Sequence, residues 1–183
     1  MSMLQTRLFS KADVFKLFLV SAFPVHVWAI LTLFKWSSSL TLSLSVLEIV
    51  SVTAYVLVFA LLESLVIFIP LSLLAYLFFS GVTGAHPISN GAAIILPVSI
   101  SAAAIHLYRF LEIKAVDFPQ WASLWAAGAL AAVAFFIYWL RNNDKVDRAL
   151  RSLVDRLAVL SLIYLLLDLI SGFVVLLRNL AAS

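Results

Sequence analysis

The chain has 183 residues, of which 64% are hydrophobic and 11% charged, whereas a soluble domain averages about 45–50% apolar and about 25% charged residues. A water-soluble fold would have to expose much of this apolar surface, so the composition excludes a soluble globular domain and predicts an all-α integral membrane protein with a single transmembrane domain, residues 1–183. The lack of cysteine excludes thiol catalysis, and because basic residues of membrane proteins mostly report orientation, the net charge of +3 does not predict a nucleic-acid partner.

The first predicted span covers residues 14–34. Ser10-Lys11-Ala12-Asp13 has the Ser-x-x-Asp form of a capping box, which predicts that the helix starts at Ser10. The apolar run is longer than the roughly 7–15 residues of a signal-peptide core, so we expect it to be retained in the membrane. The polar run 35–39, Lys-Trp-Ser-Ser-Ser, is expected to end the helix, with Trp36 at the lipid–water boundary.

The second predicted span, residues 44–79, belongs to a stretch of forty apolar residues that is open to two interpretations. One helix of that length would be about 60 Å long, about twice the hydrocarbon thickness of about 30 Å. Two spans would need a turn near Glu63 or Pro70, where the sequence has no Gly, Asn or basic residue. We therefore expect one long helix, kinked at Pro70, after a polar lead-in at 40–45.

Three further spans are predicted, at residues 92–111, 121–140 and 157–177. The loop 80–91 contains Gly, Pro and Asn and separates the second span from the third. The fifth span is preceded by the charged segment 143–156, in which acidic and basic residues lie four apart on a helix. Apolar residues in that segment follow one helical face, so it is predicted to be an amphipathic lead-in continuous with the last span.

The distribution of basic residues favours five spans over six. With five spans and a cytoplasmic N-terminus, eight basic residues lie inside and four outside, whereas six spans give six on each side. The inner residues are Arg7, Lys11, Lys16, Arg141, Lys145, Arg148, Arg151 and Arg156, and the outer ones are Lys35, Arg109, Lys114 and Arg178. The positive-inside rule thus predicts a multi-pass protein with a cytoplasmic N-terminus and its C-terminus on the opposite side.

Three ionisable residues lie near the middle of predicted spans: His26, Glu63 and Asp168. Ionisable groups inside a membrane are costly and are candidate functional groups. Three of them at one depth could bind a cation or relay a proton. Alternatively, each is a hydrogen-bonded side chain that holds helices together, and this structural interpretation is the favoured one.

Two further hypotheses concern the outer side of the membrane. Glu48 and Arg109 are expected at the same depth, which predicts an ion pair between them. His106 and Arg109 lie three apart on one helix and could contact a lipid headgroup or a cofactor, although an interfacial arginine usually extends its charge to the interface without a specific partner. The sequence contains no His-Glu-x-x-His or similar motif, so no metal site is predicted.

No motif names a reaction, and no catalytic residue is predicted. The sequence favours a non-catalytic polytopic membrane protein, an accessory or structural subunit of a larger complex, with the lipid bilayer and other membrane subunits or further copies of itself as partners. The first alternative is a small proton- or cation-coupled transporter or channel that uses His26, Glu63 and Asp168. The second is a lipid-binding or lipid-modifying protein. Whether a pigment, haem or lipid is bound, and any transported species, stay open.

Overall fold

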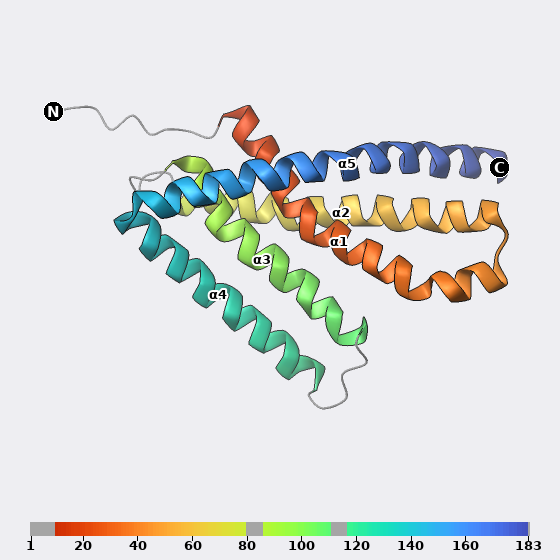
Figure 1. Ribbon diagram of the computed structural model, residues 1–183, viewed down its shortest axis with the longest axis horizontal. Helices are drawn as coiled ribbons and strands as arrows, with labels where there is room; N and C mark the ends of the chain where they lie inside the picture. Colours follow the sequence, from red (N-terminus) through yellow and green to blue (C-terminus); the bar gives the residue numbers. More distant parts are fainter. Residues whose placement is uncertain (1–9, 80–85, 111–116, 183) are drawn as a thin grey trace.

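The computed structural model describes residues 10–79, 86–110 and 117–182, and this part of the chain is entirely helical apart from short turns (Figure 1). Its five helices are α1 (Lys11–Ser43), α2 (Val46–Phe79), α3 (Pro87–Phe110), α4 (Phe118–Asn142) and α5 (Asp144–Ala182). Each is long and apolar enough to cross a membrane. The prediction of an all-α bundle with five candidate membrane spans is confirmed.

Helix α1 begins as predicted but ends later than predicted. The Ser10 hydroxyl accepts from the Asp13 N–H at 3.1 Å, and the Asp13 carboxylate accepts from the Ser10 N–H at 3.1 Å, which completes the capping box. The serine run does not end the helix, which continues to Ser43. Its hydroxyls donate back to carbonyls of the preceding turn, as Ser37 does to Phe34 at 2.8 Å, so these residues remain compatible with a helix.

Residues 46–79 form the single long helix α2, as predicted, and the segment 40–45 is not a separate lead-in, because its first four residues belong to α1. The turn into α2 has its own capping box: the Glu48 carboxylate accepts from both the N–H and the hydroxyl of Ser45 at 2.8 Å. Pro70 lies inside α2, in a continuous helical stretch. The bend expected at Pro70 stays a prediction.

Helix α3 begins five residues before its predicted span, at Pro87. Proline is favoured at the first helical position because its missing N–H would have no helical partner there. The imidazole Nδ1 of His86 accepts from the N–H of Ile88 at 3.4 Å, so the loop histidine caps the helix. The residues from Pro87 to Gly91, which were expected to be loop, are therefore the first turn of α3.

Helix α5 confirms that the charged segment is continuous with the last span, because one helix runs from Asp144 to Ala182. Within the segment, Arg151 pairs with Asp147 at 2.8 Å, one turn away. The backbone N–H of His86 donates to the Asp147 carboxylate at 3.3 Å. The start of α5 thus also fixes the start of α3.

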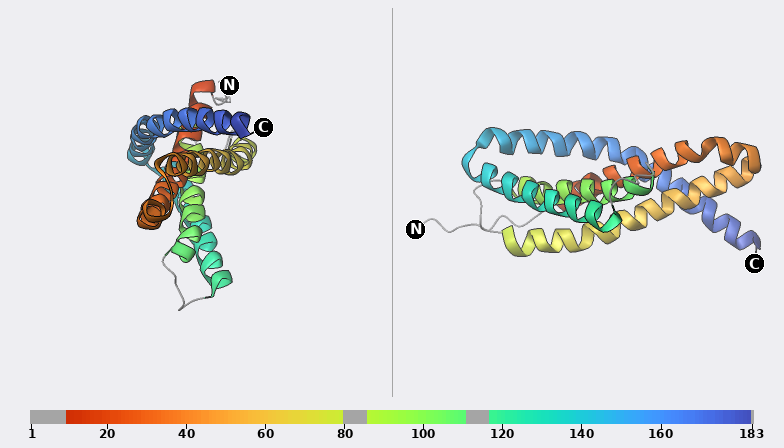
Figure 2. Two further views of the ribbon diagram at one scale, coloured as in Figure 1. Left: turned by 90° about the vertical axis from the view of Figure 1, so that its right-hand side faces the viewer. Right: turned by 90° about the horizontal axis from the view of Figure 1, so that it is seen from below.

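Helices α1, α2 and α5 form one bundle, from which the α3–α4 hairpin diverges (Figures 1 and 2). The first and last helices run in the same direction, since Lys16 contacts Asp155 and His26 contacts Asp168 at nearly constant sequence offset. Helix α4 packs along α3 and meets α5, but in the described part of the chain it does not touch α1 or α2. The α1–α2 turn and the end of α5 project beyond the α3–α4 hairpin (Figure 2).

The main core lies where all five helices approach one another, near the start of α3. Val20, Ala92, Ile95 and Val154 are each at most 1% exposed there. The outer faces carry large apolar side chains, including Phe59, Leu130 and Ile163, each more than half exposed. A surface of this kind is compatible with lipid rather than water. The bundle is therefore a multi-pass membrane protein in contact with the lipid bilayer.

Candidate functional site

His26 and Asp168 form a buried pair that joins α1 to α5. The imidazole Nε2 lies 3.1 Å and 3.0 Å from the two carboxylate oxygens, and Nδ1 lies 2.9 Å from the carbonyl oxygen of Ala22. The side chains are 1% and 2% exposed. Two of the three ionisable residues that were expected near mid-span are thus in direct contact.

The hydrogen bonds restrict where protons can reside in this pair. A backbone carbonyl only accepts, so Nδ1 of His26 must carry a hydrogen. Nε2 then either donates to an ionised Asp168 or accepts from a protonated one. The pair is electrically neutral in both arrangements, because the second differs from the first only by transfer of one proton within the pair. It could hold a single proton without placing net charge in the apolar interior.

Tyr164 completes the surroundings of the pair. Its ring stacks on the imidazole of His26, with centroids 5.4 Å apart and planes inclined by 12°. Tyr164 lies one turn before Asp168 on α5, between the buried Ser161 and Ser171. These four residues follow a three-and-four spacing that marks one helical face. Sequence reasoning singled out only Asp168, although this polar spacing was a readable signal for the other three.

Glu63 belongs to a different contact. Its carboxylate lies 3.1 Å from Nε2 of His106, and both side chains are roughly half exposed. The ring of His106 also stacks on Trp28, with centroids 6.2 Å apart. Helix α2 therefore presents Glu63 to α3, whereas His26 and Asp168 meet between α1 and α5. The expected three-residue cluster is divided into two separate pairs.

The predicted Glu48–Arg109 pair falls on an arginine side chain that lies outside the described residues, so it stays a prediction. Glu48 itself caps α2 through Ser45, whose N–H and hydroxyl lower the pKa of the Glu48 carboxyl, and the positive charge of Arg178 at the end of α5 acts in the same direction. The proposed contact of His106 and Arg109 with a headgroup is likewise untested at Arg109. His106 is described, and its partners are Glu63 and Trp28.

The buried pair has no access through the large cavity that borders α1. This cavity has a volume of about 750 Å³ and is lined by Phe23, Pro24, Val27 and Trp28 on one face of α1. His26 lies on the opposite face, and neither it nor Asp168 lines the cavity. Among the residues that the structure describes, no three His, Asp or Glu side chains gather as metal ligands would. The His26–Asp168 pair can therefore hold α1 and α5 together and store one proton.

No protein-family model, curated protein or solved structure matches this chain.

Proposed function

We propose that this protein is a non-catalytic accessory subunit of a larger membrane complex, with its N-terminus in the cytoplasm and the α1–α2 turn on the opposite side of the membrane. The observation that carries the proposal is the α1–α2 tip, defined as residues 36–48. This segment projects beyond the α3–α4 hairpin (Figure 2). It also exposes large apolar side chains.

Polar contacts at two levels support a placement of the bilayer that leaves the tip outside it. On one side Lys16 pairs with Asp155 at 2.7 Å. On the other side Tyr55 donates to Asn179 at 2.8 Å and lies under the guanidinium of Arg178. The stretch of α1 from Lys16 to Lys35 is about 29 Å long at 1.5 Å per residue, close to the hydrocarbon thickness of about 30 Å.

The α1–α2 tip then extends beyond the hydrocarbon. Leu42 is 89% exposed, Val46 78% and Leu47 80%. Contiguous apolar side chains that project from a membrane protein into an aqueous region favour burial against another protein. The serine and threonine hydroxyls between them are already bonded to the helix backbone, as Ser43 is to Ser39 at 2.7 Å. The tip therefore offers a partner mainly apolar contact area.

The buried pair supports a structural rather than a transport role. Both ring nitrogens of His26 and both carboxylate oxygens of Asp168 have a partner within the pair or in Ala22, and proton transport would require water to reach them. Interhelical polar contacts of this kind are common devices for holding membrane helices together. We therefore assign the pair to the stability of the bundle.

Site-specific photo-crosslinking in the native membrane tests the accessory role. A photoreactive side chain at Leu47 is expected to give one discrete adduct with a different membrane protein. The matched control is Phe59 on the same helix, which is 66% exposed but lies between the two polar levels and should react with lipid only. Adducts with lipid alone at both positions, or only with a second copy of this chain, would contradict the proposal.

A further inference from the structure

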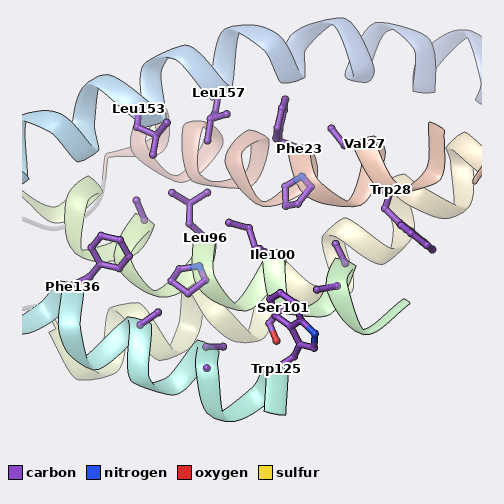
Figure 3. A pocket seen from close by; sticks show the side chains of 18 of the residues that line it. Phe23, Val27, Trp28, Leu96, Ile100, Ser101, Trp125, Phe136, Leu153 and Leu157 are labelled. Atoms are coloured by element: carbon purple, nitrogen blue, oxygen red, sulfur yellow. The ribbon is translucent and has the colours of Figure 1, made fainter. Parts of the chain in front are cut away.

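The cavity of about 750 Å³ lies between α1, α3, α4 and α5 (Figure 3). Its walls are almost wholly apolar, with Leu96, Ile100, Phe136 and Leu153 among the larger side chains. The volume falls in the range of roughly 300–1,000 Å³ that small-molecule sites occupy. It is open on one side because α4 diverges from α1 and α5 (Figure 1).

Small residues on α4 create this space. Gly128, Ala129 and Ala132 all line the cavity, and a Cβ atom added at Gly128 would meet nothing within 4 Å. The sequence pattern Gly128-x3-Ala132 is often used for close helix packing. Here it faces open space instead, so the small residues leave room for something other than a neighbouring helix of this chain.

One end of the cavity carries polar groups. Nε1 of Trp125 is buried and has no hydrogen-bond partner among the described residues. Ser101 on α3 faces the Trp125 side chain at the same level (Figure 3). The hairpin sets this level, since one turn further along it Trp121 donates to the Ala104 carbonyl at 3.1 Å. An indole N–H only donates, and leaving it unsatisfied in an apolar site is costly. The geometry therefore calls for a ligand with an acceptor oxygen at this level.

Beyond Trp125 lies the half-exposed Glu63–His106 pair. Trp28 connects the two regions, since it lines the cavity and stacks on the imidazole of His106. A carboxylate beside an imidazole offers both a negative group and a hydrogen-bond donor for a ligand that carries charges of both signs. Along α3 towards His106, the apolar wall of the cavity is thus followed by the level of the Trp125 N–H donor and then by the charged Glu63–His106 pair.

This order is the order of a phospholipid: acyl chain, ester carbonyl and headgroup. We propose that the cavity holds one acyl chain of an ethanolamine phospholipid. The ester carbonyl accepts from Trp125, the ammonium group lies beside Glu63, and the phosphate lies beside His106. Glu63 lies eight residues inward of Tyr55 on α2, about 12 Å at 1.5 Å per residue. The headgroup is therefore held below the outer polar level, beside the end of the shorter α3–α4 hairpin (Figure 1). An isoprenoid quinone would place a carbonyl but no charge beside Glu63.

Native mass spectrometry of the full chain, released from nanodiscs that contain equal amounts of ethanolamine phospholipid and glycerol phospholipid together with an isoprenoid quinone, tests the proposal. The wild-type protein is expected to retain one ethanolamine phospholipid. Gly128→Phe fills the cavity and should lower retention at least about fivefold, the lower end of what overpacking a filled site costs. Gly172→Phe is the matched control, because Gly172 on α5 is equally open but does not line the cavity.

Two further variants test the polar contacts without filling the cavity. Trp125→Phe keeps the ring, removes the donor and should lower retention of both phospholipids about fivefold, the factor that corresponds to one neutral hydrogen bond. Glu63→Gln should remove the preference for ethanolamine over glycerol phospholipid. Equal retention by Gly128→Phe and Gly172→Phe would overturn the site. An unchanged preference in Glu63→Gln would overturn the headgroup assignment, and retention of a quinone instead would overturn the ligand class.

Discussion

The His26–Asp168 pair places two ionisable side chains where neither would be stable alone. Burying a single charge in an apolar interior is expensive, but this pair is neutral whichever residue holds the shared proton. Its carbonyl contact to Ala22 uses the remaining imidazole donor. The pair is therefore expected to stabilise the packing of α1 against α5.

A double-mutant cycle measures that contribution. His26→Ala, Asp168→Ala and the double variant are expected to give a coupling free energy of about 1 kcal/mol, within the range of interhelical polar contacts in membranes. Reversible unfolding in mixed micelles of the wild type and the three variants provides the four free energies of unfolding that the cycle requires. A coupling free energy indistinguishable from zero would mean that the buried pair does not stabilise the bundle.

The Lys16–Asp155 pair supplies the comparison. It has the shorter contact, at 2.7 Å, but both side chains are about half exposed. Exposed ion pairs contribute about 0.2–1 kcal/mol because solvent screens them and side-chain freedom is lost. We expect the Lys16→Ala and Asp155→Ala cycle to give a smaller coupling than the buried pair, and a coupling that decreases in high salt. A larger, salt-independent value would reverse this ranking.

The sequence predicts some residues of the two interhelical pairs, His26–Asp168 and Glu63–His106, better than others. His26 and Asp168 could be selected because ionisable residues are conspicuous in apolar spans. Glu63 was grouped with them because depth along a helix can be counted, but the face that a residue presents cannot. The direction of Glu63 depends on how α2 crosses α3, and it is this crossing that brings it to His106. Tyr164 was not predicted, because an aromatic residue is not conspicuous in an apolar span.

The five helices differ in what limits their stability. Helix α5 contains Gly172 in its interior, and a Cβ there would meet nothing within 4 Å. Glycine in a helix interior costs about 1 kcal/mol relative to alanine, through backbone entropy. This penalty has no visible compensation in packing.

Gly172→Ala is therefore expected to raise the free energy of unfolding by roughly 0.5–1 kcal/mol. The same mixed-micelle unfolding experiment measures it. Ser10→Ala is a comparison variant with the opposite expected effect. It removes the capping box of α1 and should lower the free energy of unfolding by about 1 kcal/mol. A destabilising Gly172→Ala would show that a close partner of α5 occupies this face.

Helix ends were the least predictable feature of the elements. The serine run after Lys35 was expected to end α1, but hydroxyls that bond the preceding turn keep it helical to Ser43. Conversely, Ser45-x-x-Glu48 is a readable capping box that marks the start of α2 at Val46, whereas the span was expected from residue 44. In both cases side-chain to backbone bonding decided the boundary, while hydropathy located only the apolar part.

The arrangement of all five helices has a direct topological test. The chain contains no cysteine, so single cysteines can be introduced without background. With five crossings and a cytoplasmic N-terminus, Ser45→Cys should react with a membrane-impermeant maleimide on intact cells. Lys145→Cys, in the turn between α4 and α5, should react only after permeabilisation. Labelling of both on intact cells is the pattern of a six-span arrangement and would contradict the proposed orientation.

Composition and loop charge were sufficient to predict the number of helices, but not their three-dimensional arrangement. The α3–α4 hairpin follows from the short connection between two apolar runs. Where it diverges from α5, the Gly128 side of α4 faces a cavity, although small residues four apart such as Gly128 and Ala132 are also typical of close helix contacts. A small residue permits either outcome, so only the assembled bundle distinguishes them.

The contact between His26 and Asp168 also has a consequence for biogenesis. It joins the first helix to the fifth across 142 positions, so it cannot form until the last helix has entered the membrane. During synthesis, α1 resides in the bilayer with an imidazole that still lacks its acidic partner. Chains interrupted before α5 would retain that exposed polar group. The pair thus distinguishes completed chains, in which the imidazole of His26 is paired, from unfinished ones, in which it is not.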